Sequence, residues 1–344
     1  MRYAALLLGG VLALSLSGAA VGAGQEAKDF RAGTTDVART QKDFAGGTDE
    51  FRFAVIGDRT GKHRPGVFED AMDKVEALRP DFVINIGDLI EGNTEDRAQL
   101  GREWDVNAAI DRLSVPFFYV PGNHDLTNEV QRSEWRKRLG ADYYSFTYKG
   151  ALFLVLNTED PPQPKIARMQ LFQQYGGEAM KTVFEALQGD PAKAEALFAH
   201  DPKLAELAGK IRGSENVAFS ADQVKMVRDA LAKTPKARWT FVLMHRPAWK
   251  MDSPAFHEIE AMLKGRPHTV LAGHYHKYAY EERGGHDYVQ LGTTGGMPGG
   301  AADDPAVVDH VLWVSVADGA PRVSNLKLDG FFGKQGPSPV VKVR

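Results

Sequence analysis

The sequence contains no cysteine among its 344 residues. Disulfide bonds, thiolate metal ligands and a cysteine nucleophile are therefore all excluded. The chain also lacks a basic excess, because 42 lysines and arginines stand against 45 aspartates and glutamates, a formal net charge of −3. That balance gives no support for a nucleic-acid-binding patch or a membrane-surface binder. With 43% apolar and 25% charged residues, the chain can form one large globular domain or two smaller ones.

Only one long apolar run is present, and it lies at the start of the chain. Arg2 gives this segment a positive charge, residues 4–16 are apolar, and the small residues 17–23 follow. This order is typical of a signal peptide, here cleaved after Ala23. A membrane anchor is the alternative, but a run of about 13 residues is shorter than the roughly 20 that span a bilayer. We therefore expect a signal peptide over residues 1–23 and an exported protein, periplasmic or secreted, with no membrane span in the mature chain.

The next part of the chain changes from a polar segment to alternating strands and helices. Residues 24–50 are polar, show no helical or strand period and predict a flexible leader. From residue 51 onward, short β-branched and aromatic runs alternate with helical apolar patterns. This alternation favours a mainly parallel sheet covered by helices. The expected elements are strands at 51–56, 81–86 and 115–120, a helix between Pro65 and Pro80, and a helix at about 96–113.

A later segment, at about 157–217, breaks the alternation. It holds two or three helical patterns rich in alanine, lysine and glutamate, and it has no strand pattern. Its length suits a helical insertion over the rim of a site, and a surface excursion without a role is the alternative. The alternation resumes with a helix at 221–233. We expect an α/β domain over residues 51–330 that includes the insertion, followed by a loose tail at 331–344.

Five polar signatures punctuate this domain, and four of them directly follow a short apolar strand. Ligands of open α/β sheets gather at the carboxyl ends of the strands, so these signatures predict one crowded site. The signatures are GDRTG at 57–61, GDLIEG at 87–92, GNHD at 122–125, His245 within MHRP, and GHYH at 273–276.

The side chains of these signatures are oxygen and nitrogen ligands for metal ions. Carboxylate and imidazole together favour transition metals, and Mn, Fe or Zn ions suit them best. One carboxylate can bridge two cations, and Asp88 is the candidate bridge because it follows the central strand. Two ions can clamp a phosphoryl group and lower the pKa of a shared water. His124 would donate a proton to the leaving oxygen or stabilise the pentavalent state. The candidate metal ligands are Asp58, Asp88, Asn123, His245, His274 and His276.

The order GD, GD-x-x-E, GNHD, H and GHxH resembles the calcineurin-like metallophosphoesterases, over roughly residues 51–316. The resemblance implies an α/β sandwich of two mixed β-sheets flanked by helices, with a dinuclear metal centre. It also implies that Glu91, three residues after the bridging aspartate, steadies His124 beside the substrate. The ligand sets that it implies are Asp58, Asp88 and His276 for the first metal, and Asp88, Asn123, His245 and His274 for the second.

The first signature departs from the pattern of the family. Most members have D-x-H there, whereas this chain has Thr60 in place of the histidine. Threonine is a poor metal ligand beside imidazole, so the first site is expected to bind weakly, take an extra water or hold a harder ion. Arg59 is then free to grip a phosphate bidentately, or it pairs with a local carboxylate such as Glu91 or Asp96.

The leading hypothesis is an exported metal-dependent phosphohydrolase that cleaves a phosphomonoester or phosphodiester of a small phosphorylated substrate. A water or hydroxide bridging the two metal ions would attack, and His124 would assist the leaving group. A non-catalytic metal- or phosphate-binding protein on the same fold is the alternative, because of Thr60. Another kind of dinuclear hydrolase, acting on amides or lactones, has little support because its common motif H-x-H-x-D-H is absent.

Overall fold

Two β-sheets pack face to face in the computed structural model, which describes residues 29–44, 48–162, 168–188, 190–328 and 330–337. One sheet has seven strands in the order β1-β5-β6-β7-β8-β10-β9, and the other has six in the order β13-β12-β11-β2-β3-β4. Both sheets mix parallel and antiparallel pairs, which confirms the predicted sandwich of two mixed sheets. The strands of the first sheet are Phe30–Ala32, Tyr144–Tyr148, Ala151–Val155, Thr240–Leu243, His268–Ala272, His286–Gln290 and Ala279–Arg283; those of the second are Gly330–Gly333, Arg322–Lys327, His310–Val316, Phe51–Ile56, Phe82–Asn85 and Phe117–Phe118.

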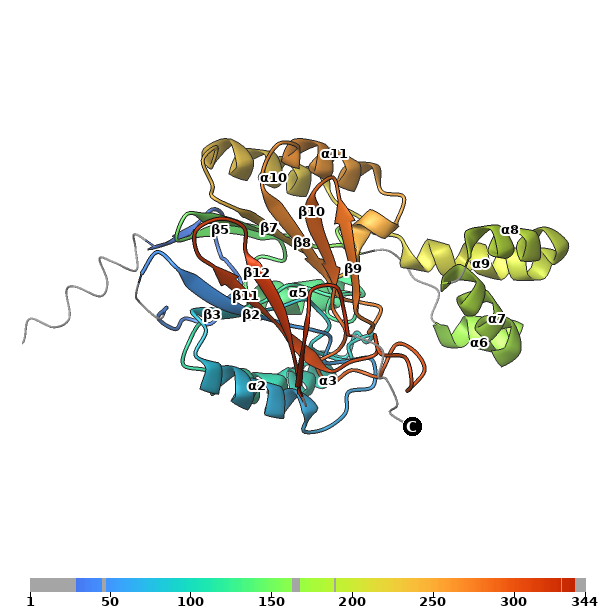
Figure 1. Ribbon diagram of the computed structural model, residues 1–344. Helices are drawn as coiled ribbons and strands as arrows, with labels where there is room; N and C mark the ends of the chain where they lie inside the picture. The colour runs from blue at the N-terminus through green and yellow to red at the C-terminus, as the bar shows by residue number, and fades with distance from the viewer. Residues whose placement is uncertain (1–28, 45–47, 163–167, 189, 329, 338–344) are drawn as a thin grey trace, which may run out of the picture.

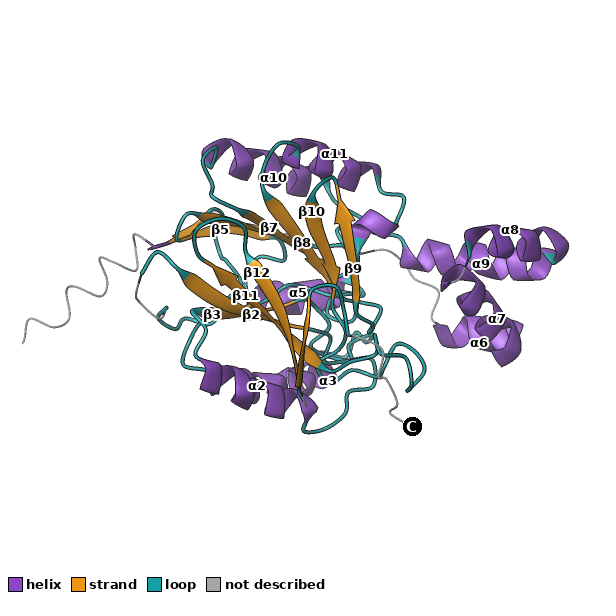
Figure 2. Ribbon diagram, viewed as in Figure 1, coloured by secondary structure: helices purple, strands orange, loops and turns teal. Residues whose placement is uncertain are grey.

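Helices cover the outer faces of both sheets, so the molecule is built in four layers (Figure 1; Figure 2). Helices α10 (Ala221–Lys233) and α11 (Pro254–Leu263) pack on the seven-stranded sheet and share a core with β6, β7 and β8. Helix α2 (Val67–Leu78) lies on the six-stranded sheet. The remaining helices of the body are α3 (Arg97–Glu103), a 3-10 turn (Trp104–Val106), α4 (Asn107–Ile110), α5 (Glu129–Arg138) and a second 3-10 turn (Ala248–Lys250).

Aromatic side chains fill the space between the two sheets. Phe53 of β2 lies edge-on to Phe153 and Phe241, with ring centroids 5.4 Å and 5.0 Å away. Phe146 stacks on Phe153 at 4.6 Å, and all four rings are fully buried. Alternate residues of a strand point to opposite faces, so Phe53 enters this core while its neighbour Arg52 points outward. This core fixes the sheets against each other and thereby fixes the loops at their ends.

Parallel pairing brings the carboxyl ends of the central strands to a common edge. Strands β2, β3 and β4 run parallel in one sheet, and β6, β7, β8 and β10 run parallel in the other. The signatures at 57–61 and 87–92 follow β2 and β3, and His245 and GHYH follow β7 and β8. Side chains that are far apart in the sequence therefore meet where the two sheets end together.

The segment at 24–50, predicted to be a flexible leader, contains an ordered strand. β1 pairs antiparallel with β5, and Ala38 is fully buried. Phe30 stacks on Phe44 with ring centroids 5.0 Å apart. The backbone of Arg39 forms an isolated antiparallel β-bridge with that of Phe118. The prediction missed this strand because two isolated phenylalanines among polar residues give no period. Residues 1–28, which hold the predicted signal peptide, lie outside the described residues.

The predicted loose tail begins in a strand as well. β13 pairs with β12, and Lys334 Nζ contacts Asp287 Oδ1 at 2.8 Å. Residues 338–344 of the tail lie outside the described part of the chain. Strand β9 is a third unpredicted strand, after β1 and β13, because its residues AYEER are mostly polar and partly exposed.

The described residues of the segment at 157–217 form four helices, which extend to one side of the body (Figure 1). They share a small apolar core of their own, which includes Leu171, Val183 and Leu207. We call residues 168–215 the helical arm. Its helices are α6 (Arg168–Tyr175), α7 (Gly177–Gln188), α8 (Pro191–His200) and α9 (Pro202–Glu215).

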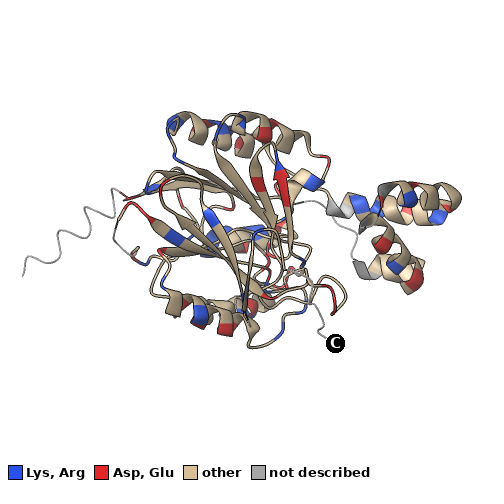
Figure 3. Cartoon of the chain, in the orientation of Figure 1, with Lys and Arg blue, Asp and Glu red and all other residues tan. Residues whose placement is uncertain are grey.

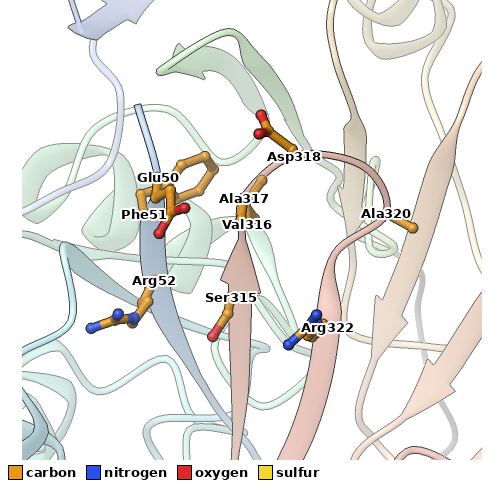
Figure 4. Close-up of a pocket in the computed structure, with 9 residues that line it drawn as sticks. All are labelled: Glu50, Phe51, Arg52, Ser315, Val316, Ala317, Asp318, Ala320 and Arg322. Atoms are coloured by element: carbon orange, nitrogen blue, oxygen red, sulfur yellow. The ribbon is translucent and has the colours of Figure 1, made fainter. Parts of the chain in front are cut away.

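Away from the strand ends, the surface of the described residues shows few features that suggest a second functional site. Acidic and basic residues are interspersed along the chain in the sandwich, its covering helices and the helical arm (Figure 3). A cavity of about 400 Å³ lies beside Arg52, Ser315 and Arg322, at the start of β2 and thus at the other end of that strand from Asp58 (Figure 4). Among the described helices, none has the length and apolar character needed to cross a membrane.

Candidate metal centre

Asp58 and Asp88 form the floor of the predicted site. They are 0% and 1% exposed, and oxygens of both lie within 4.8 Å of one another and of a ring nitrogen of His276. The backbone carbonyl of Asp58 accepts N–H bonds from Thr294 at 2.9 Å and Gly296 at 3.1 Å, so the glycine-rich loop after β10 braces it. Buried carboxylates this close are unfavourable unless cations compensate them, so this floor suits metal ions.

Asp125, the last residue of GNHD, holds the turn that carries Asp88. The carboxylate of Asp125 accepts the backbone N–H groups of Asp88 and Gly122 at 2.8 Å each. It also accepts those of Leu89 at 3.0 Å and Ile90 at 3.2 Å. Asp125 is 1% exposed, so these bonds form away from water. The sequence analysis assigned Asp125 no role, although it stands within a recognised signature.

His245 is oriented so that one ring nitrogen faces the centre. Its Nδ1 lies 2.9 Å from the carbonyl oxygen of Ile86, which can only accept, so Nδ1 carries the proton. Its Nε2 then points at Asp88 Oδ2 at 3.2 Å and at Asn123 Oδ1 at 3.1 Å. His274 Nδ1 lies 3.2 Å from the same Nε2. Three of the side chains predicted to hold the second ion, those of Asp88, Asn123 and His274, therefore lie within 3.2 Å of Nε2 of the fourth, His245.

His276 completes the other side of the centre. Its Nδ1 lies 2.5 Å from the carbonyl oxygen of Met297, which leaves Nε2 facing Asp58 Oδ1 at 3.5 Å. The set predicted for the first ion thus also comes together. Ligation of a metal by either set stays a prediction.

The backbone is strained where it presents these ligands. Asp88, His274 and His276 have φ angles of 57°, 77° and 54°, in the left-handed region that few residues other than glycine adopt. Two glycines are also required by close packing. A Cβ at Gly122 would lie 2.2 Å from Asp88 Oδ1, and one at Gly273 would lie 2.4 Å from Asp58 Oδ2. Strained backbone of this kind is typical of a functional site, and it persists because the surrounding contacts hold the carboxylates in place.

The charges of the centre shift the pKa values of its members. Burial alone would lower the pKa of His245, but the carboxylates of Asp88 and Asp58 outweigh burial and raise it to about 9. Burial likewise opposes, and Asp58 raises, the pKa of His276, which reaches about 8. Burial would raise the pKa of Asp88, but His245 and His124 hold it well below its usual range. Burial and the nearby Asp88 raise the pKa of Asp125 to about 6.

The structure places His124 beside Asp88 but corrects the role predicted for Glu91. The backbone N–H of His124 donates to Asp88 Oδ1 at 2.9 Å, and its Nδ1 lies 2.7 Å from the backbone carbonyl of Glu91. The Glu91 carboxylate instead accepts the backbone N–H groups of Lys62 and His63 at 3.1 Å and 2.9 Å. His124 is therefore oriented by a main-chain oxygen at the predicted position, because the carboxylate turns to the neighbouring loop.

The described residues show no ion pair between Arg59 and Glu91 or Asp96, and its grip on a phosphate stays a prediction. Its Nη1 donates to the backbone carbonyl of Leu89 at 2.9 Å, and its guanidinium lies 5.7 Å from the ring centroid of Phe68. Burial lowers its pKa against the opposing charges of several nearby carboxylates, of which Glu69 has the largest effect. Arg59 thus packs beneath α2. Thr60, which replaces the histidine of the family pattern, is fully buried.

The sequence analysis also missed Arg246, which follows His245. Its side chain is buried, and its Nη1 lies 3.1 Å from His274 Nε2. The signal was present in the signature MHRP, but a single arginine after a strand does not predict where its guanidinium lies.

Comparison with known proteins identifies the class of this chain. Residues 51–278 match the family model for calcineurin-like phosphoesterases. This match covers more than half of the 344 residues, so the chain belongs to the calcineurin-like phosphoesterase family. The predicted resemblance is confirmed.

Two curated relatives and one solved structure agree with this class. The human serine/threonine-protein phosphatase CPPED1 is 36% identical over 102 residues, which are 26% of this chain and 31% of that protein. A probable glycerophosphodiester phosphodiesterase GpdQ from Arcobacter nitrofigilis is 32% identical over 129 residues, or 36% of this chain and 42% of that protein. The chain thus spans less than half the length of these relatives. A dimetal phosphatase from Danio rerio covers 84% of this chain and 99% of its own at a TM-score of 0.53 and 14% identity, which shows a shared fold.

The raised pKa values of His245 and His276 predict that metal binding releases protons. With pKa values of about 9 and about 8, both imidazoles carry a second ring proton at pH 7 in the metal-free chain. Each ring must lose one of its two protons to act as a ligand. For each proton that binding releases, the apparent metal association constant rises about tenfold per pH unit. This rise ends when the pH passes about 8 for His276 and about 9 for His245. The two groups stabilise the metal-free fold fully below their ordinary value of 6.5, and this stabilisation is lost as the pH rises through about 8 and 9. Calorimetric titration with Mn in buffers of different ionisation enthalpy measures the release; none at pH 7 would contradict the assignment.

Removing the Asp125 carboxylate is predicted to destabilise the turn that carries Asp88. Asp125→Ala leaves buried N–H groups without an acceptor and lowers the free energy of unfolding by roughly 3 kcal/mol, because relief of repulsion with Asp88 offsets only part of the loss. It also weakens Mn binding. Asp73→Ala is the control, because Asp73 pairs with Arg112 at the surface and its loss changes stability by under about 1 kcal/mol. Chemical denaturation measures both; equal stability of the two variants would refute the role of Asp125.

Proposed function

We propose that this chain is an exported phosphohydrolase that cleaves phosphomonoester or phosphodiester bonds with the help of two metal ions. The single observation that carries the proposal is the convergence of two buried carboxylates, three imidazoles and one amide at the common end of the two sheets. Membership of the phosphoesterase family and the names of the relatives support the same reaction class. Export rests on the apolar segment before Ala23.

The donors of the centre fit Mn, Fe or Zn ions, because they combine carboxylate oxygen with imidazole nitrogen. Asp58, Asp88 and His276 would hold the first ion. Asp88 would be shared with the second, whose other ligands are Asn123, His245 and His274. Such ions, when bound, neutralise phosphoryl charge and make water a stronger nucleophile at neutral pH.

His124 is assigned the proton transfer to the leaving oxygen. A carbonyl oxygen can only accept a hydrogen bond, so the contact with Glu91 assigns a proton to Nδ1 of His124. Asn93 Nδ2 donates to the same carbonyl at 3.0 Å and also lies 3.0 Å from Nδ1 of His124. Nε2 is then the nitrogen that can carry the transferable proton toward a substrate. The partly exposed ring is accessible to such a group.

A non-catalytic metal- or phosphate-binding protein is the second candidate. The observation that favours it is Thr60, which is buried where most of the family has a metal-binding histidine. The first ion would then have three protein ligands and bind weakly. Measurement of ester hydrolysis separates the two candidates, since a binding protein would bind phosphate but would hydrolyse no phosphoester.

The variant His124→Ala tests the proposed chemistry. The mature chain loaded with Mn should hydrolyse p-nitrophenyl phosphate or its bis ester, and the variant should lose roughly 10²- to 10⁴-fold in kcat while keeping its metal content. His257→Ala is the control, because His257 is exposed on α11 and should leave kcat unchanged. Unchanged turnover in His124→Ala would remove the acid role. No turnover of either ester by the wild type would favour the binding protein.

A further inference from the structure

The loop between β10 and β11 contacts two of the three residues predicted to hold the first ion. We call residues 293–297 the brace loop. Its Thr294 donates a backbone N–H to the carbonyl oxygen of Asp58 at 2.9 Å, and the carbonyl oxygen of its Met297 lies 2.5 Å from Nδ1 of His276. Groups that contact a metal ligand from behind fix the direction in which that ligand points. The position of the brace loop therefore decides how Asp58 and His276 face each other.

The brace loop depends on contacts from outside, because it contains two adjacent glycines. Gly295 has a φ angle of 114°, and glycine-rich backbone gains little rigidity from its own sequence. Arg64, in the loop after β2, supplies such contacts. Its backbone N–H donates to the carbonyl oxygen of Gly295 at 2.7 Å, and its Nε donates to that of Gly296 at 3.1 Å. One arginine thus holds two neighbouring carbonyl groups of the brace loop.

Asp309, which directly precedes β11, holds the other end of this arginine. Its Oδ1 accepts hydrogen bonds from Nη2 of Arg64 at 2.5 Å, from the hydroxyl of Thr293 at 2.7 Å and from the backbone N–H of Gly295 at 3.3 Å. A hydrogen bond between two ionised groups is shorter and stronger than one between neutral groups. The ion pair of Arg64 and Asp309 therefore joins the loop after β2, the brace loop and the start of β11.

The place of this ion pair separates its effect on the metal centre from its effect on the whole fold. The side chains of Arg64 and Asp309 are 38% and 25% exposed, and ion pairs at such positions contribute little to the stability of a fold. Among the described residues, no hydrogen bond joins the brace loop to Asn123 or His245 of the second ligand set. Loss of the ion pair should therefore weaken the first ion and spare the second.

We propose that Arg64 and Asp309 are positioning residues for the first metal ion, because their ion pair holds the brace loop against Asp58 and His276. Neither side chain is a ligand; the pair acts through the amide and carbonyl groups of the loop. A chain without the pair keeps all three ligands but must order them as the ion binds, which lowers the affinity. This inference rests on the proposed function for the identity of the ligands, and it requires metal binding but no hydrolysis.

Calorimetric titration of the metal-free mature chain with Mn tests this role, because it resolves the binding of each ion as a step. The variant His276→Ala removes a ligand of the first set alone and so identifies the step that belongs to the first ion. Arg64→Gln and Asp309→Asn should each weaken that step roughly 10- to 100-fold, as removal of the partner of a metal ligand does, and should leave the other step within about twofold of the wild type.

Two further variants separate a lost contact from a lost fold. Arg64→Lys keeps the charge but loses the contact of Nε with Gly296, so it should weaken the first ion by an intermediate factor. The double variant Arg64→Gln/Asp309→Asn should lose about as much affinity as the weaker-binding single variant, because both changes break one link. If the neutral variants fail to fold, wild-type affinity for the first ion in Arg64→Lys would overturn the inference.

Arg112→Gln is the matched control, because Arg112 forms an exposed ion pair with Asp73 that includes no residue of the brace loop. It should leave both steps within about twofold of the wild type. Unchanged affinity for the first ion in folded Arg64→Gln and Asp309→Asn chains would overturn the inference. Equal weakening of both ions, an equal loss in Arg112→Gln, or a His276→Ala chain that loses no binding step would overturn it as well.

The same variants keep this inference apart from the proposed function. A first ion that depends on Arg64 and Asp309, in a wild-type chain that hydrolyses no phosphoester, would leave the inference standing and end the proposed function. Ester hydrolysis by a wild-type chain whose first ion is indifferent to both variants would do the reverse.

Discussion

Two carboxylates, Asp58 and Asp88, are buried side by side at the end of the sandwich. The other groups of the centre compensate the charge of these two carboxylates. Two negative charges in a dry site repel each other and lose their hydration, so they persist only with positive charge nearby. Without metal, His245 and His276 supply it, and their pKa values rise in consequence. We propose that the same carboxylates ligate metal ions when these are bound.

The fold imposes this arrangement through its backbone more than through its side chains. Parallel strands from both sheets end together, and the turns that follow are held in left-handed conformations at Asp88, His274 and His276. Asp125 ties four backbone N–H groups around the central carboxylate. A rigid frame of this kind lets charge stabilise a phosphoryl group without reorganisation at the moment of reaction.

The sequence predicted the central strands, the helical segment at 157–217 and the convergence of the polar signatures, because strand ends and apolar periods are local features. It did not predict β1, because one phenylalanine beside polar residues gives no strand period and the strand is defined by its pairing with β5. It named Glu91 as the residue that steadies His124 but did not predict that the backbone oxygen of Glu91 makes the contact, since side-chain direction depends on the loop opposite. Arg59 and Arg246 show the same limit: their guanidinium groups lie several bonds from the backbone, and tertiary contacts decide where they go.

Diffraction from crystals of the Mn-loaded mature chain, with the anomalous signal of the metal recorded, tests the central claim most directly. The account predicts two peaks, roughly 3.5–4 Å apart, that share the carboxylate of Asp88. One ion would be bound by Asp58 and His276, and the other by Asn123, His245 and His274. A chain that holds no ion at these side chains in excess Mn, or an ion bound without Asp88, would contradict it.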